Sequence, residues 1–120
     1  MAVIADAVFD AALNYVKSNV NKVQVVKSSS GVLVSKSSSV GSADFGAAGD
    51  YASGGREIDC LTGSDFQSLA VSTGGNAAKV RLLKSSVVVA VASIASAPIA
   101  LGSSDKVNIG SFAIILKDPT

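Results

Sequence analysis

The stretch KVRLLKSSVVVAVASIASAPIALGSSDKVNIGSFAIIL, residues 79–116, decides the fold of this 120-residue chain. It contains three apolar runs, KVRLLK (79–84), VVVAVASI (87–94) and KVNIGSFAIIL (106–116), and most of the chain's β-forming residues are concentrated in it. β-Branched side chains pack well on the pleated surface of a sheet. We therefore expect these runs to form the core of a β domain.

The middle run, residues 87–94, carries apolar side chains on both faces of a strand. Such a pattern is typical of a central strand that is covered on both sides. Ser85 and Ser86 separate it from the first run, which predicts a tight antiparallel hairpin. We expect residues 79–84 and 106–116 to flank this central strand, with a bulge or bend at Gly110.

Residues 4–18 predict one amphipathic helix. Its apolar side chains recur with a 3.6-residue period at Ile4, Val8, Ala11, Ala12 and Tyr15, and Phe9, Leu13 and Val16 widen that face. A helix of about three turns is too short to be stable alone in water. It must therefore dock, either on its own sheet or on a neighbouring subunit.

Between the helix and the closing block, the sequence predicts short strands and one long loop. Residues 22–27 and 32–36 surround the turn SSSG and predict a hairpin, and residues 56–61 and 66–72 predict two further strands. Residues 37–55 are rich in Ser, Gly and Ala, which predicts a long loop of the kind that often carries binding. Its anchors are Phe45 and Tyr51, either folded back on the domain or pressed on a partner.

These segments together predict a single domain that spans residues 1–120. Its expected fold class is mainly β, an antiparallel β-sandwich or barrel with one short amino-terminal helix at residues 4–18. The core is the block 79–116, and residues 37–55 form a long loop.

The polar residues give no catalytic or metal-binding constellation. The chain has no histidine, which removes Ser-His-Asp and Cys-His pairs and most zinc sites. Cys60 is the single cysteine, and we interpret it as a buried small hydrophobe. Glu57 and Asp59 share one face of a strand, which we interpret as the solvated face of an edge strand. We expect no enzyme activity, no cofactor and no metal.

Charge and hydropathy restrict the partners. The formal net charge is +1 and the lysines are scattered, so the chain has no basic stripe to follow a nucleic-acid backbone. The most apolar stretch, residues 87–101, is shorter than the roughly 20 residues that a helix needs to cross a bilayer. The opening MAVIADAV lacks the basic region of a secretory signal. We expect neither nucleic acid nor a membrane as a partner.

The opening MAVIADAVFDAALNYVKSN, residues 1–19, resembles the start of a family of small virion structural proteins of tailed bacteriophages, which begin with a close variant of MAxIADxVxDxxLNYI. The resemblance continues at residues 55–58, in the hairpin near residues 82–94 and in the closing strand with its KDP ending. It implies a component of the virion that is assembled in the host cytoplasm and has no catalytic residues.

The resemblance, the long loop and a helix that needs a partner favour a capsid decoration or cement protein, which stabilises the head by binding major capsid subunits or other virion proteins. The alternatives are a tail, neck or fibre-attachment protein and a host-surface binding module. We expect a homotrimer or homodimer, because a two-sided apolar strand in so small a domain needs a covering subunit. The candidate contact residues are Val8, Phe9 and Tyr15 in the helix and Phe45 and Tyr51 in the loop.

Overall fold

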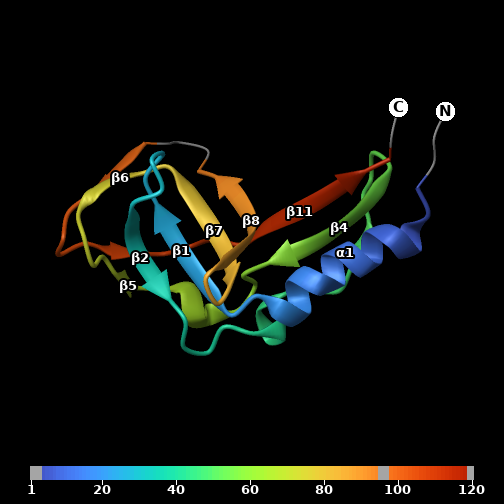
Figure 1. The fold of residues 1–120 in the computed structure, drawn as a ribbon, viewed down its shortest axis with the longest axis horizontal. Helices are drawn as coiled ribbons and strands as arrows, with labels where there is room; N and C mark the ends of the chain where they lie inside the picture. Colours follow the sequence, from blue (N-terminus) through green and yellow to red (C-terminus); the bar gives the residue numbers. More distant parts are fainter. Residues whose placement is uncertain (1–3, 95–97, 119–120) are drawn as a thin grey trace.

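The computed structural model describes residues 4–94 and 98–118, which form one helix and a series of short antiparallel strands (Figure 1). The helix is α1 (Asp6–Asn19), and η1 (Ser42–Asp44) and η2 (Ser64–Phe66) are single 3-10 turns. The strands are β1 (Lys22–Val26), β2 (Val32–Lys36), β3 (Gly49–Asp50), β4 (Gly55–Cys60), β5 (Leu69–Ala70), β6 (Gly75–Ala77), β7 (Lys79–Lys84), β8 (Val87–Ser93), β9 (Ile99–Leu101), β10 (Lys106–Val107) and β11 (Phe112–Lys117). The described part of the chain is therefore mainly β with an amino-terminal helix, as the sequence predicted.

The largest sheet has four antiparallel strands in the order β2-β1-β7-β8. It confirms two predicted hairpins, β1–β2 and β7–β8, and Ser85 in the second turn adopts a positive φ of 56°. Strand β1 lies between β2 and β7, with Val25 opposite both Val34 and Val80. All three valines are buried, so the alternation of residues 22–26 correctly indicated an inward face.

A second sheet has the order β11-β4-β3, and two small pairs, β5–β10 and β6–β9, complete the strands of the described segments. In β4, the buried residues Ile58 and Cys60 lie opposite Ile114 and Phe112 of β11. The four sheets remain separate, so the fold is an open, sandwich-like arrangement and not a closed barrel.

One apolar cluster joins α1, the four-stranded sheet and β4. Its largest fully buried side chains are Phe66, Leu13, Leu33, Ile58, Leu61 and Leu82. Leu13 comes from α1 and Phe66 from η2, so the helix and an irregular segment supply parts of the core that the strands alone do not fill. This explains how the short helix is stabilised: it packs on its own domain.

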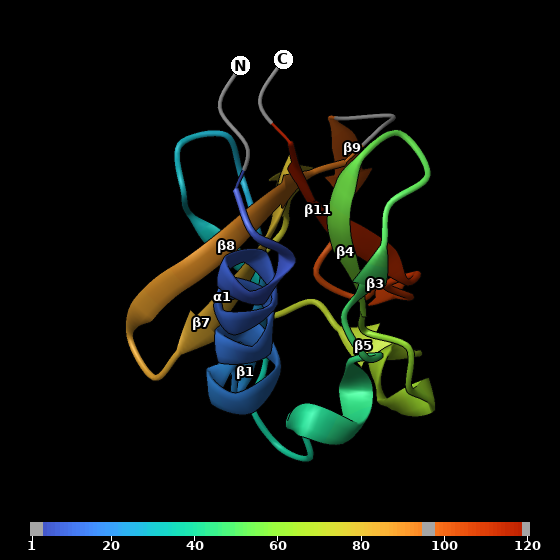
Figure 2. The same ribbon diagram turned by 90° about the vertical axis from the view of Figure 1, so that its right-hand side faces the viewer.

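The molecule is elongated, with extents of 49 × 28 × 23 Å. Its radius of gyration, 15.1 Å, exceeds the value of about 14 Å expected for a compact domain of this length. Figure 1 shows why: α1, β4 and β11 extend to one side of the four-stranded sheet. Figure 2 views the molecule from that end and shows α1 between the β7–β8 hairpin and strands β3 and β4.

The prediction that residues 87–94 form a central strand was wrong. Strand β8 is an edge strand that pairs only with β7, and the predicted flanking strand β11 pairs with β4. Apolar side chains on both faces show that a strand could be buried on both sides. They do not show that other parts of the same chain pack against both faces. Here Val87, Val88 and Val91 remain exposed.

Two other strand predictions need correction. The run 106–116 divides into β10 and β11, and between them Ile109 turns inward and donates its N–H to the carbonyl of Phe66 at 2.9 Å. The interruption includes Gly110, where a bulge was expected. Of residues 66–72 only β5 is a strand, because Phe66 is buried in η2 and Ser68 adopts a positive φ of 53°.

The segment 37–55 was predicted as a long loop but contains η1 and β3. It folds back on the domain, which was one of the two alternatives for its anchors. Phe45 is buried in the core, and Asp44 accepts the N–H of Gly41 at 3.0 Å through its carboxylate. The polar segment is therefore held by backbone contacts that its composition does not reveal.

Candidate docking surface

Helix α1 has three distinct faces. The first is buried: Phe9, Leu13 and Val16 follow one another at i, i+4 and i+7 and pack inward. The sequence predicted one apolar face through Ile4, Val8, Ala11, Ala12 and Tyr15, widened by Phe9, Leu13 and Val16, and left open whether it docks on its own sheet or on a neighbouring subunit. In the structure the first five residues are exposed, and the three widening residues are buried.

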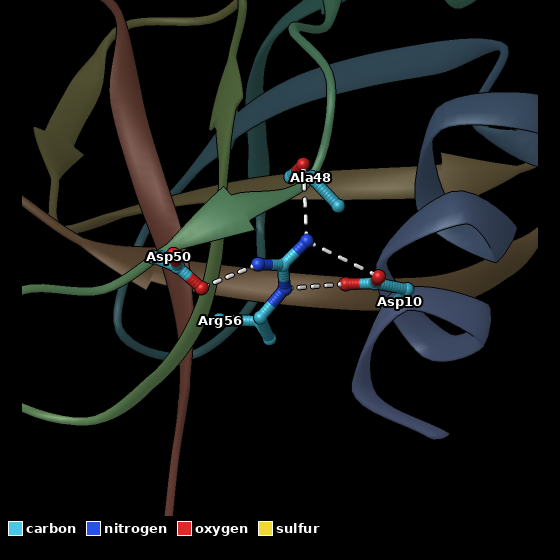
Figure 3. Close-up of polar contacts among 4 residues, drawn as sticks. All are labelled: Asp10, Ala48, Asp50 and Arg56. Carbon is cyan, nitrogen blue, oxygen red and sulfur yellow. Dashed lines mark hydrogen bonds and ion pairs between the residues drawn. The ribbon is translucent and has the colours of Figure 1, made fainter. Parts of the chain in front are cut away.

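The second face of α1 is polar and attaches the helix to the rest of the domain. The Lys17 ammonium donates to the carbonyls of Phe45 at 3.0 Å and Gly46 at 3.2 Å. About two turns earlier along this face, Asp10 binds the guanidinium of Arg56. Figure 3 shows Arg56 between Asp10 of α1 and Asp50 of β3, with the Ala48 carbonyl as a further acceptor.

The carboxylates of Asp10 and Asp50 both stabilise the charged form of Arg56. Hydrogen bonds to Asp10 and Asp50 raise the pKa of its guanidinium further above its already high ordinary value. The charge is therefore permanent, and both neighbouring carboxylates are engaged as acceptors. This cluster connects α1, β3 and β4.

The third face of α1 is apolar and exposed. It comprises Val8, Ala12 and Tyr15, and Ile4, just before the helix, continues it with the spacing i, i+4, i+8 and i+11; we call these four residues the outer stripe. Val8 is 60% exposed and Tyr15 51% exposed. The outer stripe lies on the opposite flank of the buried face from Asp10 and Lys17, because successive helical residues are 100° apart. Its apolar side chains are not needed to hold the helix in place.

Beside Tyr15, a groove of about 520 Å³ runs between α1 and two strands. We call it the α1–β8 groove; it is lined by Ala12, Leu13, Tyr15, Val16, Val87, Val88, Val89, Ala90, Ile114 and Leu116. A smaller groove of about 270 Å³ continues between β8 and β11. The described residues that line the two grooves include no charged side chain. An exposed apolar surface of this continuity is typical of protein–protein contact sites.

The five candidate contact residues separate into three groups. Val8 and Tyr15 lie in the outer stripe, whereas Phe9 and Phe45 are buried within the protomer and cannot make direct surface contacts in this structure. Tyr51 is half-buried, with the Lys117 ammonium 5.9 Å from the centre of its ring. Val87, Val88 and Val91 are exposed but were not among the predicted contact residues, because their apolar pattern predicted a buried strand.

The groups that could carry chemistry are dispersed. Cys60 is fully buried, and desolvation by burial raises the pKa of its thiol to about 11, so the thiolate is not available as a nucleophile at neutral pH. Strand β4 lies inside its sheet and is not the edge strand that we expected, although Asp59 is exposed and Glu57 half-buried. Within residues 4–94 and 98–118, no group of three or more Cys, Asp or Glu side chains is placed to hold a metal.

Comparison of the chain with known protein families, curated proteins and solved structures finds no match. Among the helices of the described residues, none has the length and apolar character to cross a bilayer. The residues of the predicted stretch 87–101 that the structure describes form β8 and β9, and residues 95–97 lie outside the described part.

Proposed function

We propose that this chain is a non-enzymatic structural protein that docks on a larger protein assembly through the outer stripe and the α1–β8 groove. The observation that carries the proposal is the continuity of this exposed, uncharged surface across α1, β8 and β11. Solvent-exposed apolar side chains gain free energy when a partner covers them. Burying Val8 and Tyr15, each at least half exposed, would contribute about 1–2 kcal/mol apiece.

The assembly that we propose is a tailed-bacteriophage virion, with the chain as a capsid decoration or cement protein on major capsid subunits. This part of the proposal rests on the resemblance of residues 1–19 to small virion structural proteins. The attachment of α1 supports docking in general, because Asp10 and Lys17 hold the helix with the outer stripe exposed. A preformed surface loses little conformational entropy when it docks.

Binding of purified protein to capsids that lack it tests the docking surface. Tyr15→Lys and Val8→Lys each place a charge in the outer stripe and should weaken capsid binding by tenfold or more, since a desolvated, unpaired charge costs more than about 1.4 kcal/mol. Ser18→Lys, at an exposed polar position of the same helix, is the matched control. Unchanged binding by both stripe variants would contradict the docking surface.

The copy number in virions decides between the proposed function and its alternative. A decoration protein is present in numbers that follow the many capsid subunits, whereas a tail, neck or fibre-attachment protein is present in about a dozen copies or fewer. Quantitative mass spectrometry of purified virions measures this directly. The host-surface alternative relied on Phe45 and Tyr51 as contacts, and the burial of Phe45 leaves it with less support.

A further inference from the structure

The two edges of the four-stranded sheet differ in a way that the docking function does not explain. At the β2 edge, the Leu33 carbonyl accepts the N–H of Ser72 at 2.8 Å and its hydroxyl at 3.0 Å, so the connecting chain covers part of that edge. At the β8 edge, no strand of the described residues pairs with the outer side. The bare edge lies on the strand with the most exposed valines: Val87 is 64% exposed and Val91 53%.

Backbone geometry identifies the free groups of β8. Ile94 donates its N–H to the Ala78 carbonyl at 3.0 Å, so Ile94 faces β7. Successive residues of a strand point their N–H and C=O groups to opposite sides. Ala92 and Ala90 therefore also face β7, whereas Val91 and Ser93 direct their N–H and C=O groups to the open side.

Residues 90–93 of the open edge lack the charged residues and prolines that usually protect an edge strand against pairing. Natural edge strands carry lysines, prolines or inward charges that prevent association. Strand β8 has no charged residue and no proline from Val87 to Ser93, whereas the open edge of β11 ends in Lys117. The register shift at Leu82 and Leu83 is a bulge that bends the first half of β8. The regular, unprotected part of the edge is therefore residues 90–93.

The chemistry of this edge fits a second copy of the same strand. A pairing strand must be extended, to bind the free backbone groups, and uncharged, to lie beside Val91 without burying a charge. Strand β8 itself meets both conditions. Antiparallel pairing about a two-fold axis near Val91 places Val91 against its equivalent and brings no like charges together, and a two-fold interface closes without polymerising.

We propose that β8 pairs antiparallel with β8 of a second copy of this chain, about a two-fold axis near Val91, so that two four-stranded sheets become one. The contact leaves the outer stripe of α1 free. Dimerisation uses the backbone edge of residues 90–93, which overlaps the α1–β8 groove only at Ala90. A change in the outer stripe should therefore not affect dimerisation.

Cysteine cross-linking tests this arrangement in the full chain. Cys60 is the only native cysteine and is buried, so an introduced thiol is the accessible one. Val91→Cys should give a disulfide-linked dimer under mild oxidation, because facing residues of an antiparallel pair have Cβ atoms about 4.5–5.5 Å apart. Val8→Cys is the matched control, since Val8 is similarly exposed, 60% against 53% for Val91, but lies in α1 and not on the β8 edge. Equal cross-linking of the two variants, or none at Val91, would overturn the proposal.

Sedimentation provides the second measurement. The native chain should sediment as a dimer, and Val91→Lys should raise the dimer dissociation constant at least about tenfold by opposing two ammonium groups. Ser93→Lys charges the same edge and replaces Val91→Lys if that variant fails to fold. Val8→Lys should remain dimeric even where it loses capsid binding, which separates this inference from the proposed function. A native monomer, or a trimer unaffected by both edge variants, would refute β8 pairing.

Discussion

Arg56 binds Asp10 through two hydrogen bonds, from Nε to Oδ1 at 2.8 Å and from Nη2 to Oδ2 at 3.2 Å. The bond spans 46 positions of sequence and joins β4 to α1. The same guanidinium reaches Asp50 of β3, so one side chain aligns a helix with a sheet of three strands. The orientation of the outer stripe depends on this alignment.

We therefore expect Arg56→Gln to lower the melting temperature and to loosen α1. Arg56→Lys should recover only part of the loss, because a lysine ammonium cannot form the paired, planar hydrogen bonds of a guanidinium. Thermal unfolding by circular dichroism measures the first effect, and proteolysis near residues 4–19 the second. Lys84→Gln, at the exposed last residue of β7, is the control. Equal melting temperatures for Arg56→Gln and Lys84→Gln would show that the bridge does not stabilise the helix.

Substitutions in the buried face of α1 and in the outer stripe should differ strongly in their effect on the free energy of unfolding. Leu13→Ala removes a fully buried side chain and should cost about 2–5 kcal/mol, since both transfer free energy and a cavity contribute. Val8→Ala should change the free energy of unfolding by less than about 0.5 kcal/mol, because Val8 is mostly exposed. Urea denaturation of both variants checks this difference. A large cost for Val8→Ala would mean that the outer stripe is covered in the isolated protein.

The sequence predicted the helix and many of the strands more accurately than it predicted which strands pair with each other. The alternation at residues 22–26, the Ser85–Ser86 turn and the helical period of residues 4–18 are local signals, and each led to the correct element. The position of β8 in its sheet depends on long-range pairing, which a strand's own residues do not encode. Helix α1 shows the same limit, because residues 4–16 carry two apolar stripes and only the rest of the core determines that Leu13 turns inward.

The polar contacts were even harder to predict from the sequence. Nothing near Arg56 in the sequence indicates a partner 46 residues away, and the glycine-rich segment before it was predicted as a long loop. The docking surface was predictable in part, since Val8 and Tyr15 were named as contacts. Strand β8, which lines the other side of the α1–β8 groove, has an apolar sequence pattern, but this pattern could not be distinguished from that of a core strand.

The position of Gly55 should not accept any residue with a side chain. Its φ is +115°, and a Cβ there would collide with the backbone carbonyl of Leu116 in the paired strand β11. Gly55→Ala should therefore destabilise the protein by more than about 1 kcal/mol, because it combines backbone strain with a steric clash. Gly49→Ala in β3 is the matched control, since a Cβ there meets no atom within 4 Å. Similar melting temperatures for the two variants would contradict this account of the β4–β11 contact.

Cys60 should make stability fall at alkaline pH. Burial raises the pKa of its thiol from 9.0 to about 11, an effect partly opposed by a backbone hydrogen bond from Ile114 and reinforced by the charge of Asp59. Between these values the unfolded chain loses the thiol proton while the folded chain keeps it. The unfolded state then binds fewer protons, so the free energy of unfolding decreases as pH rises through this window.

Urea denaturation of the native chain and of Cys60→Ala, at about pH 8 and about pH 10, isolates this contribution. Lysines also titrate in the alkaline range, but they are common to both proteins and their contribution cancels in the difference. The native chain should lose more stability than Cys60→Ala over the interval, because only the native chain has a thiol that must stay protonated in the core. Parallel losses in the two proteins would mean that the Cys60 site admits water and that its thiol ionises as easily in the folded chain as in the unfolded one.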